Sequence, residues 1–387
     1  MDTGAVALPA GFRSHVANIG IKDETDDFLV LAADEPCPAA AVFTRSRFAG
    51  PSVTLSRLHV ADGRLQAFVV VSKNATVANG SVGDADAAEL AASVARALGA
   101  DPGDVLVAST GVIGRPYPME RVRAHLATLA PPFPGQDALG AARAIMTTDT
   151  VPKVAEAAAG PARVVGIAKG VGMIEPDMAT LITLFLTDAA VEPESLDAAF
   201  RRVIDRTFNA LSIDTDTSTS DTAAIMASGT AGPVDPAGFE AALHAVALSL
   251  TRQIARDGEG ATTLIEVTVD RARDEAQARR VAKAIVNSPL VKTAVHGADP
   301  NWGRVAMAVG KCSDDTDIDQ RRVTIRFGAQ EVYPRPVDEV GLAELAGYMK
   351  GGEVRIHVSL ATGDAAFTAF GCDLSDEYVR INADYTT

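Results

Sequence analysis

Short apolar runs of strand length alternate along this chain with segments whose apolar residues recur at helical spacing, and this alternation limits the possible folds. The runs at 67–72 and 181–186, AFVVVS and LITLFL, predict strands, the second buried on both faces. Leu90, Val94 and Leu98 fall on one face of a predicted helix. Further helices and strands follow in the same alternation. The pattern predicts an α/β or α+β sandwich of helices on mixed sheets.

The 387 residues are enough for a large core and two domains. The last hundred residues are mostly strand-like, with the segments RRVTIRFG, EVRIHVSL and AAFTAFGCDL. A change to this strand-rich pattern occurs between Asp270 and Trp302. We therefore expect a main α/β domain over residues 1–280 and a smaller strand-rich domain over 281–387.

Composition excludes several classes of function. The net charge of −15 argues against a nucleic-acid partner, which needs a basic face. No apolar run approaches the roughly 18 residues of a membrane span, and no secretory signal peptide is visible at the N-terminus. Three cysteines without a CxxC pair suit a reducing compartment, so we expect a cytoplasmic protein. The six histidines are scattered, and we expect no metal site.

The segment KGVGMIEPDMAT, residues 169–180, leads from a glycine-rich loop into the buried run at 181–186. Thr180 has two interpretations, a strand-opening threonine or an autocatalytic nucleophile whose Oγ attacks the carbonyl of Ala179. In the second, cleavage makes Thr180 the N-terminus of a new chain, and its own α-amine serves as general base. An α-amine titrates near 7.7–8.0, which suits that role. Gly170 and Gly172 permit the strained turn that such an attack needs.

Other polar stretches are also open to two interpretations. ASTGVIG, residues 108–114, is either an ordinary turn or an oxyanion hole built from backbone N–H groups and the Thr110 hydroxyl. DTDTSTSDT, residues 214–222, is similar to a calcium loop but lacks the glycine at its sixth position and the glutamate at its twelfth. We reject calcium there. Glu259, in DGEGA, is either a solvated carboxylate or a ligand contact.

Six motifs in fixed order resemble one known family. They are STGVIG, MTTDT, KGVGMIEPDMAT, DGEGA, GADPNWGRVAMAVG and the final INADYTT. Together they are similar to the ornithine acetyltransferases, also called glutamate N-acetyltransferases, over nearly the whole chain. The resemblance implies a precursor that cuts itself between Ala179 and Thr180. It implies an α chain of residues 1–179, a β chain from residue 180, an α2β2 heterotetramer and no cofactor. The implied fold is of the self-processing N-terminal-nucleophile type, related to the DmpA-like fold.

The resemblance also implies a ping-pong reaction. N2-acetylornithine acetylates Thr180, ornithine leaves, and glutamate takes the acetyl group. Thr110 and Gly111 would form the oxyanion hole. Lys169 is suited to the substrate carboxylate and Glu259 to the distal ammonium. The implied substrate contacts are Thr147, Lys169, Thr180, Glu259, Asn382 and Thr387.

One departure from the family pattern precedes the nucleophile. Members that serve arginine biosynthesis often read HPNMAT, whereas this chain has Glu175 and Asp177 in EPDMAT. Two other stretches, FTRSRFAGPSVTLSR and CSDDTDIDQRRVTIRFG, resemble the paralogue of clavulanic-acid biosynthetic clusters. The alternatives are a self-cleaving aminopeptidase or amidase of related fold, a bifunctional enzyme that also uses acetyl-CoA, and a binding protein that does not process itself.

Overall fold

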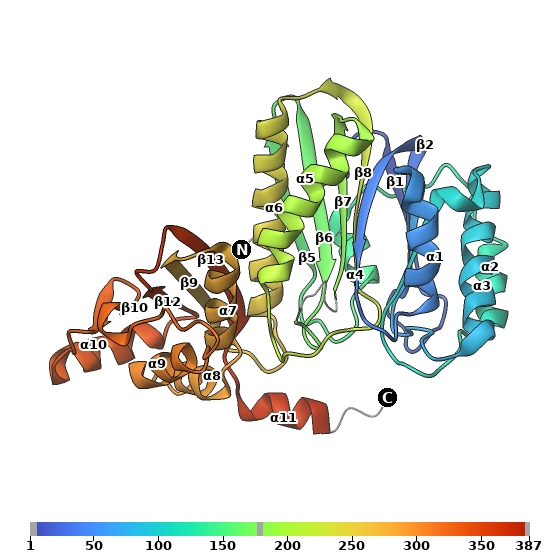
Figure 1. Ribbon diagram of the computed structural model, residues 1–387. Coiled ribbons are helices and arrows are strands. Elements are labelled where there is room, and N and C mark those ends of the chain that lie inside the picture. The colour runs from blue at the N-terminus through green and yellow to red at the C-terminus, as the bar shows by residue number, and fades with distance from the viewer. Residues whose placement is uncertain (1–5, 176–180, 384–387) are drawn as a thin grey trace.

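The computed structural model describes residues 6–175 and 181–383, which form two β-sheets with helices packed on them (Figure 1). The first sheet has eight strands in the order β4-β3-β2-β8-β7-β6-β5, with β1 paired to β2. Its strands are β1 (Phe12–Ala17), β2 (Phe28–Phe43), β3 (Arg64–Val71), β4 (Val105–Ser109), β5 (Lys153–Ala159), β6 (Ala162–Lys169), β7 (Ile182–Ala190) and β8 (Thr222–Pro233).

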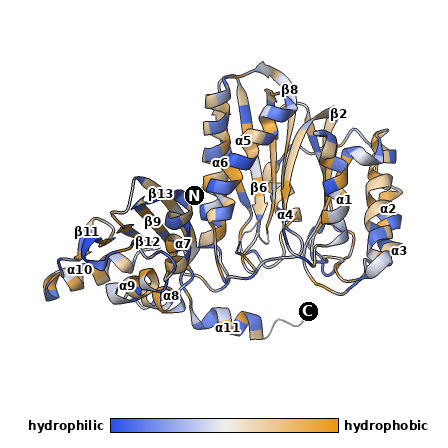
Figure 2. Cartoon of the chain, viewed as in Figure 1, coloured by the Kyte–Doolittle hydropathy of each residue, from blue (hydrophilic) through white to orange (hydrophobic). Residues whose placement is uncertain are grey.

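Helices cover both faces of this sheet (Figure 1). Helices α5 (Pro193–Arg206) and α6 (Pro236–Arg256) pack on one face, and α4 (Ala138–Ala144) packs on the other. Near β3 and β4 lie α1 (Pro51–His59), α2 (Gly80–Leu98) and α3 (Met119–Leu126). Figure 2 shows the strands largely in hydrophobic colours, whereas α6 alternates between blue and orange.

Strand β7 is buried on both faces, as its sequence predicts. Phe185 belongs to the hydrophobic cluster that includes α5 and α6. Its neighbours Leu184 and Leu186 belong to the cluster that includes α4. This alternation follows from the two-residue period of a strand and places β7 at the centre of the molecule.

The second sheet has five strands in the order β11-β10-β12-β9-β13. They are β9 (Leu264–Ala272), β10 (Thr324–Phe327), β11 (Gln330–Tyr333), β12 (Glu353–Ser359) and β13 (Ala365–Cys372). The helices of this part are α7 (Glu275–Val286), α8 (Pro289–His296), α9 (Trp302–Gly310), α10 (Glu339–Met349) and α11 (Asp376–Ala383). Strand β9 and the first half of α7 precede the boundary predicted at 280–281, yet both belong with the second sheet. The division into domains stays a prediction, and we propose to place it between α6 and β9.

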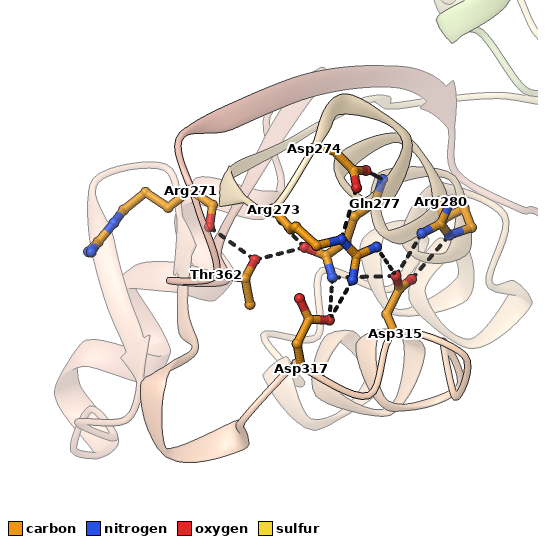
Figure 3. Close-up of polar contacts among 8 residues, drawn as sticks. All are labelled: Arg271, Arg273, Asp274, Gln277, Arg280, Asp315, Asp317 and Thr362. Carbon is orange, nitrogen blue, oxygen red and sulfur yellow. Dashed lines mark hydrogen bonds and ion pairs between the residues drawn. The ribbon is translucent and has the colours of Figure 1, made fainter.

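Charged side chains hold the loop after α9 against the start of α7 (Figure 3). The carboxylate of Asp315 accepts hydrogen bonds from Arg280 (2.6 and 3.1 Å) and Arg273 (3.2 Å). Asp317 accepts from Gln277 at 2.9 Å and from Arg273 at 3.0 Å. The side chain of Asp315 is only 2% exposed, so its charge is compensated by these arginines rather than by water. Among the described residues, no helix is both long enough and apolar enough to cross a bilayer.

Candidate active site

A cavity of about 220 Å³ lies where β4 and β6 end and where β7 and β8 begin. Six of the residues predicted from the sequence line it, namely Thr110, Gly111, Thr147, Lys169, Glu259 and Asn382. The other three predicted residues, Ala179, Thr180 and Thr387, lie outside the described residues. A larger groove of about 610 Å³ between α1 and α5 contains none of the predicted residues.

The turn at Thr110 and Gly111 is built on the loop that follows β3. The Thr110 N–H donates to the Val71 carbonyl at 3.2 Å, and the Thr110 side chain is buried. Gly111 has φ +129°, and a Cβ there would lie 2.2 Å from the backbone carbonyl carbon of Lys73. No other residue fits at this position without moving the backbone, because both the dihedral angle and the space exclude a side chain.

Lys169 is the buried cation of the cavity. Its side-chain Nζ lies 3.3 Å from Thr110 Oγ1 and donates to it. Burial lowers the pKa of Lys169, although the carboxylate of Asp149 and, more weakly, those of Asp221 and Glu259 favour the charged form. Because the ammonium occupies a lone pair of Thr110, the hydroxyl hydrogen of that threonine is available for a group in the cavity.

A buried ion-pair triad joins two walls of the cavity. Lys153 Nζ lies 2.7 Å from Asp149 Oδ1 and 2.6 Å from Asp257 Oδ2, and the Lys153 side chain is fully buried. Burial by itself would raise the pKa of Asp149, but Lys169 and Lys153 together hold it below its ordinary value. Asp149 also accepts the N–H groups of Thr147 (3.1 Å) and Gly170 (2.7 Å). The triad therefore fixes the loop that carries Thr147 next to the loop that carries Glu259.

Glu259 lies in the segment between α6 and β9. Its Oε2 accepts a hydrogen bond from Asn382 Nδ2 at 2.9 Å, and its backbone N–H donates to the Val171 carbonyl at 2.8 Å. Asn382 comes from α11, which lies below the first sheet in Figure 1. A Cβ on Gly172 would lie 2.5 Å from Glu259 Oε2, so the glycine at this position lets the carboxylate approach.

Several functional positions were missed by the sequence reasoning. Ser218, Thr219 and Ser220 line the cavity, although the stretch 214–222 was considered only as a calcium loop. The run of hydroxyl residues in this stretch was the sequence feature that could have indicated a polar wall of the cavity. Lys153 had no local signal, whereas Asp257 stands in the motif DGEGA; their pairing could not be predicted because they are 104 positions apart in sequence.

The described chain resumes at Leu181, directly before β7. The Leu181 N–H donates to Asp221 Oδ1 at 2.9 Å, and the Leu181 carbonyl accepts from the Thr222 N–H at 3.0 Å. Burial raises the pKa of Asp221 well above its ordinary value. The residue next to the predicted nucleophile is thus fixed beside Ser220, which lines the cavity.

Comparison with known proteins gives consistent matches. A sequence family described as the ArgJ family matches residues 13–387. The chain is 60% identical to "Glutamate N-acetyltransferase Oat2" of Streptomyces clavuligerus, over 100% of both chains. It is 55% identical to "Arginine biosynthesis bifunctional protein ArgJ 2" of Nostoc sp., again over 100% of both. A crystal structure of "Arginine biosynthesis bifunctional protein argJ" from Bacillus halodurans is 40% identical, with a TM-score of 0.48; the match covers 51% of this chain and 96% of that one.

Proposed function

The chain belongs to the ArgJ family, and from this premise we propose that it is a glutamate N-acetyltransferase that moves an acetyl group from N2-acetyl-L-ornithine to L-glutamate. Relatives that match over their full length carry the names of this activity and of arginine biosynthesis. The observation that carries the proposal is the cavity, which is lined by an oxyanion-type turn, a buried cation and a carboxylate.

In the first half-reaction Thr180 is the nucleophile. Its α-amine takes the proton from Oγ, and Oγ attacks the acetyl carbonyl of acetylornithine. The Gly111 N–H and the Thr110 hydroxyl donate to the oxyanion, a contribution of roughly 3–4 kcal/mol for one such donor. The protonated α-amine then gives its proton to the leaving nitrogen, and ornithine departs from acetyl-Thr180.

In the second half-reaction the amino group of glutamate attacks acetyl-Thr180. The new amide bond forms as the Thr180 ester bond breaks, and Oγ recovers its proton through the α-amine. Lys169 binds the α-carboxylate that both substrates share. Asn382 and Thr147 complete the walls, and Thr387 adds a contact from the C-terminus.

We further propose that the precursor cuts itself between Ala179 and Thr180 and that the two chains assemble as an α2β2 heterotetramer in the cytoplasm. Cleavage is what frees the α-amine that the reaction needs as base. The stretches FTRSRFAGPSVTLSR and CSDDTDIDQRRVTIRFG support service in a clavulanic-acid cluster, and the names of the relatives support service in arginine biosynthesis. Loss of the gene would produce arginine auxotrophy in the second case only.

Thr180→Ala tests the nucleophile. We expect a single full-length chain near 40.1 kDa on a denaturing gel and no acetyl transfer, because one hydroxyl serves both steps. Thr128→Ala, an exposed threonine on the surface, is the matched control and should process normally. Two normal fragments from Thr180→Ala would disprove the cleavage site.

A transfer assay tests the reaction itself. Three mixtures are compared. The first holds N-acetylornithine and glutamate, the second holds N-acetylornithine with water as the only acceptor, and the third holds acetyl-CoA and glutamate. We expect N-acetylglutamate from the first mixture. Free acetate with no N-acetylglutamate would instead indicate the related aminopeptidase or amidase chemistry.

A further inference from the structure

The loop at residues 214–221 contacts the chain on both sides of residues 176–180. On the upstream side, the N–H groups of Met173 (2.6 Å) and Ile174 (2.8 Å) donate to the two carboxylate oxygens of Asp214. The next N–H, that of Glu175, donates to the backbone carbonyl of Asp216 at 2.8 Å. Three consecutive N–H groups before the proposed cleavage site are thus bound to one short loop.

The downstream side is held by the other end of the same loop. The carboxyl group of Asp221 accepts the Leu181 N–H at 2.9 Å. Asp221 is fully buried, and its second oxygen has no hydrogen-bond partner within the described ranges. Between these two contact points, Ser218, Thr219 and Ser220 face the cavity.

The loop is itself anchored to a third segment. Thr44 Oγ1 donates to the Ser218 carbonyl at 2.6 Å, the Thr44 N–H donates to the Asp221 carbonyl at 3.1 Å, and the Gly50 N–H donates to the Thr219 carbonyl at 2.8 Å. These bonds connect the loop to the end of β2 and the start of α1. The loop is therefore a fixed support for the residues that it holds.

Glu175 adds a second upstream anchor. Its Oε2 accepts from Ser212 Oγ at 2.7 Å and from Asn287 Nδ2 at 2.5 Å. Asn287 follows α7, so the carboxylate attaches this point of the chain to the end of that helix. The acid that departs from the common HPNMAT pattern thus has a structural partner in this chain.

We propose that Asp214 and Asp221 are positioning residues for self-cleavage: they hold Met173, Ile174 and Leu181, which flank the Ala179–Thr180 bond on its two sides. This inference rests on the proposed function, which places the cleavage there. Intramolecular attack depends steeply on how the nucleophile and the carbonyl are held, and a misplacement of about 1 Å can cost about a hundredfold in rate.

Alanine variants of the two aspartates, with asparagine variants as the conservative replacements, test the proposal. Freshly translated full-length chain is followed on a denaturing gel as it converts to two chains. We expect Asp214→Ala and Asp221→Ala to slow conversion by about tenfold or more. Asp221→Asn should stay close to the wild-type rate, because one amide oxygen suffices for one N–H. Asp214→Asn should convert at an intermediate rate, because its one amide oxygen replaces the two carboxylate oxygens that accept the Met173 and Ile174 N–H groups.

Asp235→Ala is the matched control. Asp235 also accepts a backbone N–H, that of Gly238 at 2.8 Å, but at the start of α6. It should leave conversion unchanged. Thermal unfolding of each variant shows whether it is folded. If an alanine variant is unfolded, the two asparagine variants test the proposal, which predicts faster conversion for Asp221→Asn than for Asp214→Asn.

The outcomes separate the inference from the proposed function. Cleavage that needs Thr180 but proceeds at the wild-type rate in folded aspartate variants would overturn the inference alone. Normal cleavage of Thr180→Ala would overturn the proposed cleavage site and this inference with it. Slow conversion of the alanine variants, with recovery in Asp221→Asn, is the result that we expect.

Discussion

At the scale of single residues, one small cavity contains a buried cation and a carboxylate. Lys169 is 4% exposed, whereas Glu259 is partly exposed and bound by Asn382. Ornithine has a carboxylate at one end and a distal ammonium at the other, so these two charges match it. Glutamate has a carboxylate at both ends, and in the proposed site its distal group would meet Glu259 as a like charge.

Glu259→Gln tests this assignment, because it removes the charge and keeps the shape. We expect acetylornithine and ornithine to bind about tenfold or more weakly, since 1.4 kcal/mol is a factor of ten. Glutamate should bind equally well or better, because a like-charge repulsion is relieved. The two half-reactions are measured separately, with each substrate titrated alone.

Glu156→Gln is the control for this substitution. Glu156 is an exposed carboxylate paired with Arg163 at 2.6 Å, away from the cavity, and its loss should change neither half-reaction. If Glu259→Gln weakened both substrates equally, Glu259 would shape the loop and not recognise the ammonium.

The predicted site residues that are described gather in one cavity. Local patterns left several of their roles open between two interpretations, and the order of the motifs decided between them. Asp149 could be found within MTTDT, because it stands in a recognised motif. Its partner Lys153 could not, because a lysine in an alanine-rich strand gives no sign that it is fully buried. The contacts of Asp214 and Asp221 depend on folding the loop back on the chain, which sequence spacing does not reveal.

At the scale of elements, the contacts of Asp315 attach the loop after α9 to α7. We expect Asp315→Ala to lower the free energy of unfolding by about 2 kcal/mol, because two arginines lose charge-assisted hydrogen bonds to a buried acceptor. Asp197→Ala removes an exposed pair with Arg201 and should cost less than about 1 kcal/mol. Denaturant unfolding of both variants compares them, and equal losses would contradict the role of Asp315.

The same contacts predict a pH dependence. The hydrogen bond from Arg280, aided by Arg273, holds the pKa of Asp315 below its ordinary value. A depressed carboxyl pKa stabilises the fold above the unfolded value of about 3.9, and this stability is lost as the pH falls through the folded pKa. Asp315→Ala should therefore show a shallower loss of stability below about pH 4 than the wild type.

Long, periodic elements could be predicted from the sequence, and irregular ones could not. Helix α2 could be predicted because Leu90, Val94 and Leu98 recur at helical spacing. Strand β2 was not, because Pro36 and Pro38 interrupt it and its pairing with β3 shifts register between Ala32 and Cys37. The predicted boundary at 280–281 cuts α7, because β9 resembles any other buried strand until its partners β12 and β13 are known.

At the scale of the whole molecule, the first sheet interleaves the two sides of the proposed cleavage site. Strands β7 and β8 follow residue 180, yet they lie between β2 and β6, which precede it. Strand β6 pairs with β7 along Val164 to Lys169, and β8 pairs with β2 along Ala39 to Phe43. The strands that precede residue 180 are therefore divided into two groups, β4-β3-β2 and β6-β5, by the adjacent pair β8-β7 that follows it.

This interleaving would change the molecularity of unfolding once the chain is cut. An uncut Thr180→Ala chain keeps its strands on one polymer, so its melting temperature should not depend on protein concentration as long as its association state is fixed. The mature protein would dissociate into two polypeptides as it unfolds, so its melting temperature should rise with concentration, and dilution should slow its refolding. One peptide bond would thus separate a fold that can re-form by itself from one that must find its other half.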